Sequence, residues 1–236
     1  MNPVYKRVVL KISGEALAGD KKTGFDFDLI STVCGVVKEA ADAGVQIGIV
    51  IGGGNFWRGV KDGAGKVERV SADRMGMLAT CMNCLAVCDV LRQMGAKARV
   101  MTAVDIMGVG ERYDTRRAIE YMEAGEIVLF AGGSGAPFFS TDTAAVLRAA
   151  EIHADAILLA KNIDGVYSDD PRKNPDAVKF DHISYDEVLA RHLAVMDTTA
   201  TSLAMDNDIP VVVFALAQPE NILRVLGGEE LGTLVK

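Results

Sequence analysis

The chain has 236 residues, of which 50% are hydrophobic and 24% are charged, with 24 glycines and a formal net charge of −7. This balance is typical of a globular α/β protein with tight turns and argues against a disordered chain. The acidic charge and the lack of long basic runs argue against sequence-independent nucleic-acid binding, so no nucleic-acid partner is expected. Any anionic ligand must be held by a few placed cations.

The sequence also indicates the cellular location and the number of domains. The first 13 residues show no signal peptide, and no apolar stretch approaches the roughly 20 residues needed to span a membrane. We therefore expect a cytoplasmic protein with no membrane partner, whose cysteines are thiols. With about 150 residues per domain as a guide, the length fits one large domain or at most two small ones.

Hydrophobic periodicity and turn residues predict a βαβα alternation along the chain. The first half comprises a strand over 5–13, a helix over 27–43, a strand over 45–51, a helix over 71–94 capped by Ser71, a strand over 96–103, a helix over 115–123 and a strand over 127–130. The second half comprises a helix opened by Ser140 or Thr141, a strand over 156–160, a hairpin-like excursion over 164–170 and 178–183, a helix opened by Ser184, a helix over 199–207, a strand over 210–215, a helix over 219–226 with Pro219 near its start, and a last strand over 233–235. This alternation predicts an α/β fold with a mostly parallel central sheet and helices on both faces.

Lys11 stands near the carboxyl end of the first predicted strand, in the region where open α/β sheets bind ligands. It shares one face of the strand with Val9 and Ser13 because side chains alternate. A lysine there can meet a transferring phosphate. Taken alone, however, a solvated lysine at a strand end is the commoner explanation.

Three glycines, Gly52, Gly53 and Gly54, follow the second predicted strand and allow the backbone to approach a ligand closely. Arg58 lies four residues further on and can fork onto a phosphate. A tight turn explains the glycines equally well. Neither G-x-G-x-x-G nor G-x-x-x-x-G-K-[ST] occurs, so neither a dinucleotide fingerprint nor a P-loop is predicted.

Residues 126–152 combine a strand, a glycine-rich loop and a helix. A loop of this kind that leads into a helix N-terminus suits an anion, because backbone N–H groups and the positive end of the helix dipole face the ligand. Asp142 lies in the first turn, where it either compensates the dipole or orients a lysine or a phosphate. Phe138 and Phe139 stand beside these donors and suit an aromatic base.

An acidic loop over 164–170 follows the strand at 156–160 and so shares the same rim of the sheet. Tyr167 is suited to stacking on a base, and Asp170 to accepting from a sugar hydroxyl. Acidic loops are usually only solvated. Cys81, Cys84 and Cys88 have a metal-like spacing, but they share one face of a predicted helix, so packed core thiols are expected.

The residues described so far lie in motifs that resemble those of the bacterial UMP kinases in the amino-acid-kinase family. The resemblance runs from end to end through LKISGEAL (10–17), IGGGNFWRG (51–59), DRMGMLAT (73–80), SGAPFFSTDTAA (134–145), DGVYSDDP (164–171) and VMDTTA (195–200). It implies a single domain over 1–236 with a three-layer sandwich, and it implies transfer of the γ-phosphoryl group of ATP to UMP with Mg²⁺, giving ADP and UDP.

The resemblance also implies roles for individual residues. Lys11 is the catalytic lysine that bridges the transferring phosphoryl group, and Asp142 and Asp197 orient the lysine and the phosphates. The residues implied to bind ATP are Lys11, Ile12, Ser13, Gly14, Gly54, Arg58, Lys161, Tyr167 and Asp170. The residues implied to bind UMP are Gly53, Asp73, Ser134, Gly135, Ala136, Pro137, Phe138, Phe139, Ser140 and Thr141. No metal ligand is assigned.

Expectations about regulation and assembly rest only on the family resemblance. Its members form hexamers and are often activated by GTP and inhibited by UTP, and Gly19, Gly24 and Arg99 match positions tied to the GTP site. The chain departs from the family at Ala136, where many relatives have Asn, and at Lys161, where an uncharged polar residue is common. We therefore expect a homohexamer with GTP and UTP as candidate effectors.

Two alternative functions remain at this point. One is a kinase of the same fold with another acceptor, such as an amino acid, and Asp73 together with the two phenylalanines speaks against it. The other is a non-catalytic nucleotide-binding protein, which predicts loss of Lys11 or Asp142, yet both are present. Phosphoryl transfer needs in-line positioning and charge stabilisation, so no general base is expected.

Overall fold

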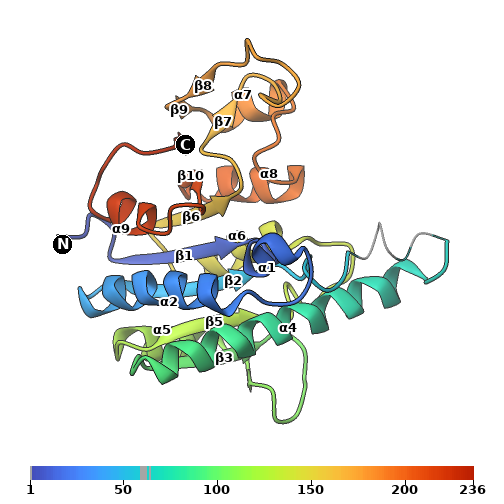
Figure 1. The fold of residues 1–236 in the computed structure, drawn as a ribbon, viewed down its shortest axis with the longest axis vertical. Helices are drawn as coiled ribbons and strands as arrows, with labels where there is room; N and C mark the ends of the chain where they lie inside the picture. Colours follow the sequence, from blue (N-terminus) through green and yellow to red (C-terminus); the bar gives the residue numbers. More distant parts are fainter. Residues whose placement is uncertain (1, 59–62, 64) are drawn as a thin grey trace.

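The computed structural model describes residues 2–58, 63 and 65–236. Within this part of the chain a nine-stranded sheet has the order β4-β3-β5-β2-β1-β6-β10-β11-β9, and its pairings are parallel except that between β10 and β11 (Figure 1). A two-stranded antiparallel sheet, β7-β8, stands apart from it. The predicted mostly parallel α/β sheet is confirmed.

The strands are β1 (Arg7–Ile12), β2 (Gln46–Ile51), β3 (Ala98–Thr102), β4 (Glu111–Arg112), β5 (Ile127–Ala131), β6 (Ala156–Lys161), β7 (Val166–Tyr167), β8 (Lys179–Phe180), β9 (His182–Ile183), β10 (Val211–Ala215) and β11 (Thr233–Val235). The helices are α1 (Gly14–Ala18), the 3-10 helix η1 (Gly19–Lys21), α2 (Phe27–Asp42), α4 (Arg69–Gln93), α5 (Thr115–Glu123), α6 (Thr141–Glu151), α7 (Tyr185–Ala190), α8 (Thr198–Asp206) and α9 (Asn221–Leu226).

The sheet separates two hydrophobic cores. Alternate residues of β1 divide between them: Leu10 and Ile12 pack with α2, α4 and α9 on one face, while Val9 packs with α5, α6 and α8 on the other (Figure 1). This alternation follows from the period of two along a strand. Lys11 is therefore on the α6 side of the sheet, and the predicted helices on both faces are confirmed.

Several element boundaries differ from the sequence prediction. Helix α4 begins at Arg69 with Glu68 at the cap position, so Ser71 lies inside the helix and does not cap it. Helix α9 begins at Asn221, after Pro219, because the preceding residues form a turn. Three short elements, α1, η1 and β4, were not predicted, since five, three and two residues are too few to show a period.

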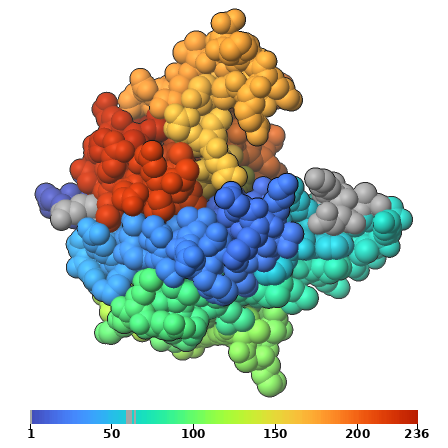
Figure 2. Space-filling model, viewed as in Figure 1, coloured from blue at the N-terminus to red at the C-terminus, as the bar shows by residue number. Residues whose placement is uncertain are grey.

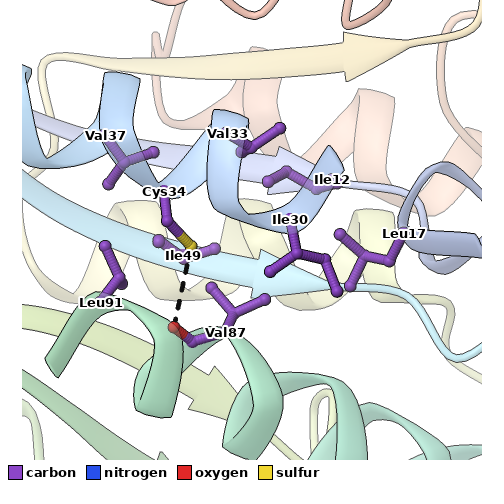
Figure 3. Close-up of a pocket in the computed structure, with 9 residues that line it drawn as sticks. All are labelled: Ile12, Leu17, Ile30, Val33, Cys34, Val37, Ile49, Val87 and Leu91. Carbon is purple, nitrogen blue, oxygen red and sulfur yellow. Dashed lines mark hydrogen bonds between the residues drawn. The ribbon is translucent and has the colours of Figure 1, made fainter. Parts of the chain in front are cut away.

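The cysteines are packed core thiols, as predicted. Cys34 of α2 points towards α4, and its Sγ lies 3.8 Å from the carbonyl oxygen of Val87, beside a cavity of about 10 Å³ lined by aliphatic side chains (Figure 3). Burial raises the pKa of Cys34 to about 12, and it raises the pKa of the fully buried Cys84 well above its usual range. Thiolate chemistry is therefore suppressed in this layer.

Helix α4 also corrects an expectation about apolar stretches. With 25 residues, it is long enough and apolar enough in composition to cross a membrane. Half of its apolar window is buried inside the protein, where it packs against α2, β3 and β5. Core helices of globular proteins share this length and composition, so these two properties do not by themselves indicate a membrane span.

Candidate active site

Four neighbouring strands, β5, β2, β1 and β6, end at one edge of the sheet. Lys11 is near the centre of this edge, opposite Val50 of β2 and Leu159 of β6. Its side chain is only 9% exposed, and its Nζ forms an ion pair with Asp142 in the first turn of α6. Because Lys11 faces the α6 side of the sheet, the start of that helix brings the carboxylate directly to the amine.

A second lysine, Lys161, ends β6 beside this pair and donates a hydrogen bond from Nζ to the carbonyl oxygen of Val195. Burial lowers the pKa of Lys161, and the positive charge of Lys11 lowers it further, while the negative charge of Asp142 opposes the shift. The charges of Lys11 and Lys161 thus both act on Asp142, and two ammonium groups at one edge of the sheet suit a phosphate.

Asp197 links the starts of α6 and α8. Its carboxylate accepts a 2.9 Å hydrogen bond from the backbone N–H of Ala200, which caps α8, and it also accepts from the hydroxyls of Ser140 and Thr143. Ser140 in turn caps α6 by accepting from the N–H groups of the first turn, as predicted. The carboxylate of Asp197 therefore fixes the end of α6 that carries Asp142.

A pocket of about 760 Å³ opens on one side of Lys11. Its walls come from the ends of β1 and β6, from the loop around Tyr167 and Asp170, and from residues 191–194. In the space-filling view this loop and its hairpin form a lobe above the sheet layers (Figure 2). A volume of this size holds a nucleotide.

Not every residue expected on this side lines the pocket. Ser13, Lys161, Tyr167 and Asp170 do, whereas the side chain of Ile12 is buried in the opposite core. The phenol of Tyr167 donates to Asp164 at 2.8 Å, and Asp170 pairs with Arg172. The hydrogen bond from Arg172 lowers the pKa of Asp170.

The glycine turn after β2 packs between α1 and α4. A Cβ added to Gly14 would collide with the carbonyl oxygen of Gly52 and would lie 2.6 Å from Oδ1 of Asn55. A Cβ added to Gly53 would lie 2.9 Å from Ala79 of α4. Glycine is therefore required at both positions by close approach. Arg58 pairs with Glu15 at 2.5 Å and donates to the carbonyl oxygen of Gly54.

The loop over 134–141 lies on the other side of Lys11 and is tied to α4. Asp73 of α4 accepts a 2.7 Å hydrogen bond from the backbone N–H of Phe138, whose φ of 72° is rare for a residue with a side chain. Arg69 pairs with the same carboxylate and lies over the Phe138 ring. The exposed rings of Phe138 and Phe139 flank this loop.

The remaining residues of the loop form its turn and its exit into α6. Ser134 makes a local turn, accepting from the N–H of Ala136 at 3.2 Å, and Gly135 has a φ of 81°. Pro137 follows in the same turn region, and Thr141 begins α6 with its hydroxyl 3.4 Å from the Cβ position of Gly52. The loop therefore spans from α4 to the glycine turn beside Lys11.

Comparison with known proteins agrees with this geometry. Residues 6–215 match the amino acid kinase family. The chain is 54% identical over 234 residues to a uridylate kinase of Streptococcus thermophilus, covering 99% of this chain and 96% of the relative.

The chain belongs to the uridylate kinases of the amino acid kinase family.

Solved structures of other uridylate kinases have the same fold. The UMP kinase of Bacillus anthracis superimposes with a TM-score of 0.95 at 38% identity, covering 98% of this chain and 96% of that structure. The UMP kinase of Ureaplasma parvum gives 0.92 at 34% identity, with 98% of both chains covered. The uridylate kinase of Archaeoglobus fulgidus gives 0.75 at 26% identity, covering 97% of this chain and 99% of that one.

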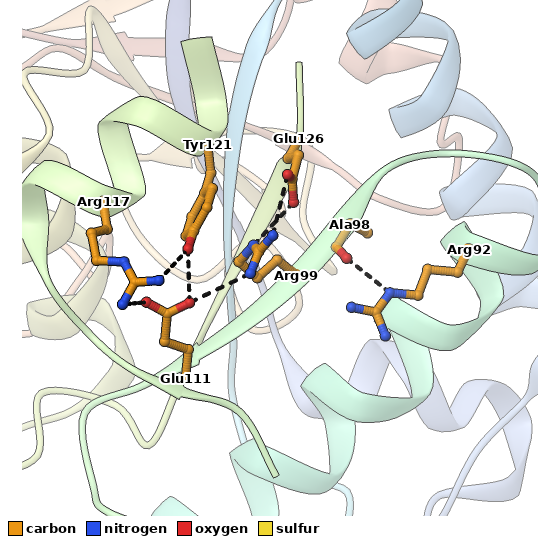
Figure 4. Close-up of polar contacts among 7 residues, drawn as sticks. All are labelled: Arg92, Ala98, Arg99, Glu111, Arg117, Tyr121 and Glu126. Atoms are coloured by element: carbon orange, nitrogen blue, oxygen red, sulfur yellow. Dashed lines mark hydrogen bonds and ion pairs between the residues drawn. The ribbon is translucent and has the colours of Figure 1, made fainter. Parts of the chain in front are cut away.

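The three residues expected at an effector site of this uridylate kinase lie in two places. Gly19 is the first residue of η1 and Gly24 follows that helix, and their φ values are 52° and 75°. Arg99 lies on β3, where it pairs with Glu126 at 3.0 Å and Glu111 at 3.4 Å and stacks on Tyr121 (Figure 4). Hydrogen bonding to Glu126 raises the pKa of Arg99. Its guanidinium is thus already engaged by carboxylates.

Sequence reasoning overlooked the polar residues on the buried face of α4. Thr80 accepts a 2.9 Å hydrogen bond from the N–H of Gly132, and Asn83 donates to the carbonyl oxygen of Gly52 at 2.6 Å. Both side chains are at most 3% exposed. Their signal was present in the sequence, because a threonine and an asparagine three residues apart interrupt an otherwise apolar helix face.

Proposed function

We propose that this chain transfers the γ-phosphoryl group of ATP to UMP and releases ADP and UDP. The observation that carries the proposal is the Lys11–Asp142 ion pair, which lies with Lys161 between a nucleotide-sized pocket and the loop over 134–141. The 54% identity to a protein named uridylate kinase supports UMP as the acceptor.

ATP occupies the 760 Å³ pocket in this proposal. Its adenosine lies against Tyr167 and Asp170, and its phosphates reach Lys11, Lys161 and the backbone around Ser13. Gly14, Gly54 and Arg58 belong to the same half of the site, with Ile12 contributing backbone only. Asp170 pairs with Arg172, and its carboxylate has further lone pairs that can accept from a ribose hydroxyl.

UMP occupies the other side of Lys11. Its base lies beside Phe138 and Phe139, and its phosphate lies near Gly53 and the start of α6. The proposed contacts are those of the loop over 134–141, together with Gly53 and Asp73. The hydrogen bond between Asp73 and the N–H of Phe138 supports this arrangement, because it holds the loop over α4 in a defined position.

The reaction requires no covalent intermediate and no strong base, because the phosphate of UMP is itself the nucleophile. The ammonium of Lys11 stabilises the charge that spreads over the transferring group, and Asp142 holds that ammonium in place. Asp197 contributes by fixing Ser140 and Thr143 at the start of α6. Lys161 supplies a second positive charge on the donor side.

Mg²⁺ is proposed as the cofactor that ATP brings with it. Among the described residues no cluster of three or more His, Cys, Asp or Glu side chains can hold a metal ion. This fits an ion held mainly by phosphate oxygens and water, with Asp142 and Asp197 as the nearby carboxylates. When bound, Mg²⁺ neutralises phosphate charge and orients the donor.

The family relationship supports further proposals about the whole protein. We propose a single domain over 1–236, a cytoplasmic location and a homohexamer. Exposed apolar side chains in one row of α4 support assembly, namely Met75, Leu78, Met82 and Leu85. GTP and UTP are the proposed activator and inhibitor, and an effector phosphate at Arg99 must compete with Glu111 and Glu126.

An acceptor panel tests the proposed activity. ADP release from ATP and Mg²⁺ is measured with UMP, CMP, dTMP, glutamate, aspartate and carbamate as separate acceptors. Turnover with UMP and little with the others is the expected result. Turnover with an amino acid would keep the chemistry of Lys11 and overturn the acceptor assignment, whereas folded protein that binds ATP without any turnover would favour a non-catalytic nucleotide-binding role.

A further inference from the structure

Two buried asparagines form a closed amide pair beneath the site. Asn83 of α4 is 0% exposed and Asn55, after the glycine turn, is 2% exposed. Nδ2 of Asn55 donates to Oδ1 of Asn83 at 2.9 Å, and Nδ2 of Asn83 donates to Oδ1 of Asn55 at 2.8 Å. Each side chain therefore uses one donor and its acceptor within the pair.

The second donor of each amide holds a glycine loop. Nδ2 of Asn83 donates to the carbonyl oxygen of Gly52 at 2.6 Å, and Nδ2 of Asn55 donates to the carbonyl oxygen of Gly24 at 2.9 Å. An amide nitrogen has two hydrogens, so both nitrogens are fully used. A buried polar network in which every donor is paired fixes its members in one arrangement.

The pair lies directly against the two glycine turns that flank Lys11. The Cβ position of Gly14 is 2.6 Å from Oδ1 of Asn55 and is also in contact with the carbonyl oxygen of Gly52. The Cβ position of Gly52 is 3.2 Å from the backbone N of Gly14. The Asn83 amide thus binds the carbonyl oxygen of Gly52 in the turn after β2. The same oxygen limits how closely the turn at Gly14, after β1, can approach.

We propose that Asn83 is a positioning residue for phosphoryl transfer. It fixes the separation between the glycine turn after β1 and the glycine turn after β2, so that their backbones meet the transferring group in line with Lys11. Thr80, on the same buried face of α4, accepts a hydrogen bond from the backbone N–H of Gly132. The inference rests on the proposed phosphotransfer and adds a residue that touches neither substrate.

A kinetic comparison of Asn83→Leu and Asn83→Ser tests the role. Leucine has a similar branched shape but no donor, whereas serine keeps a shorter hydroxyl donor and loses the amide pair with Asn55. A misplacement near 1 Å can lower a rate about 10²-fold, so we expect kcat of Asn83→Leu to fall by about that factor. The KM values for ATP and UMP should change less than about threefold, because no substrate contact is removed. Asn83→Ser should lie between wild type and Asn83→Leu.

Asn221→Leu is the matched control. Asn221 is also buried, at 5% exposed, and its Nδ2 donates to the carbonyl oxygen of Ala215 at 3.1 Å, but it lies at the start of α9. We expect it to lower Tm by a similar amount and to leave kcat unchanged. If Asn221→Leu loses as much kcat at equal loss of Tm, or if Asn83→Leu keeps kcat within twofold of wild type, the positioning role is overturned.

Amide hydrogen exchange separates this inference from the proposed function. Without any nucleotide, the amides of residues 13–16 and 52–56 should exchange faster in Asn83→Ser than in wild type, and they should be unchanged in Asn221→Leu. Unchanged exchange in Asn83→Ser would overturn the inference even in an active enzyme. Lack of UMP turnover in wild type, with faster exchange in the variant, would instead refute the acceptor assignment alone. Asn83→Ser decides the matter if Asn83→Leu does not fold.

Discussion

At the residue scale, the site depends on an ion pair between Lys11 and Asp142 that is largely shielded from solvent. Lys11 is 9% exposed and Asp142 is 18% exposed, so the pair is only weakly screened by water. Removing one member leaves the other without its partner. A third charge, Lys161, supplies a second ammonium group that can meet a bound anion.

Replacing Lys11 by alanine should abolish most of the activity. Loss of an electrostatic contact made mainly in the transition state commonly lowers kcat by about 10²–10³, and we expect Lys11→Ala to be at the upper end. Steady-state ADP release with UMP measures the effect. Lys6→Ala removes an exposed lysine just before β1, at the end of that strand away from the site, and should keep wild-type kcat. A kcat of Lys11→Ala within threefold of wild type would refute the catalytic role.

Lys161→Met should weaken ATP binding more than it slows transfer. Hydrogen bonds to charged groups are worth about 1.5–3 kcal/mol. Since about 1.4 kcal/mol is a factor of ten, the KM for ATP should rise at least about tenfold. Titration calorimetry or initial rates at varied ATP measure this. An unchanged KM for ATP would remove Lys161 from the donor site.

The lowered pKa of Lys161 also predicts how stability depends on pH. Between that lowered pKa and the value of about 10.5 in the unfolded chain, the unfolded state binds more protons, so this group's contribution to stability rises with pH. The free energy of unfolding of wild type minus that of Lys161→Met should therefore increase as pH rises through this window. Urea titrations at several pH values measure it, and a decreasing difference would contradict the buried ammonium.

At the scale of elements, the start of α6 carries the largest share of the site. Its cap Ser140, its first-turn Asp142 and the neighbouring Thr143 contact Lys11 or Asp197. The helix N-terminus also contributes its own positive dipole end. Small changes in how α6 begins should therefore appear in kcat as well as in stability.

Ser140→Ala tests that coupling. Loss of an N-cap hydroxyl destabilises a protein by about 1 kcal/mol, which lowers Tm by about 2–4 °C for a chain of this size. Because Asp197 loses a partner as well, we expect kcat to fall about tenfold or more. Asp114→Ala removes the equivalent cap of α5, away from the site, and should lower Tm similarly without changing kcat. Equal kinetic effects of the two variants would show that the cap acts only through stability.

At the scale of the whole molecule, one sheet supports two cores, and the thiols belong to only one of them. Cys34, Cys81, Cys84 and Cys88 all lie between the sheet, α2 and α4 and are at most 3% exposed. Reagents reach them only when this layer opens. Their reactivity therefore reports the integrity of the core that holds the glycine turns.

We expect none of the four cysteines to react quickly with a thiol-specific disulfide reagent in the native protein at pH 8. Burial raises the pKa of Cys34 to about 12 and thereby keeps it protonated at that pH. In denaturant all four should react at once. A thiol that reacts as fast in the native protein as in denaturant would contradict the packing of α2 against α4.

Much of this protein was determined by the sequence alone. Long periodic segments defined the helices and strands of the alternating fold, because their burial repeats locally at 2 or 3.6 residues. The ends of α5 and β11 were predicted to the residue. Lys11 and the loop over 164–170 were expected on one rim, because parallel strands end on one edge, whereas Lys161 was indicated only by the family resemblance.

Only the tertiary structure decided which polar groups meet across that rim. The pairing of Lys11 with Asp142, of Asp197 with Ser140, and of Asn83 with Asn55 joins residues that are 28 to 131 positions apart. No local period encodes such contacts, since they depend on which strands are neighbours and on where each helix begins. In the sequence, Asn83 only interrupts an apolar helix face. Its role can be inferred only from the structure, which places Asn55 against it.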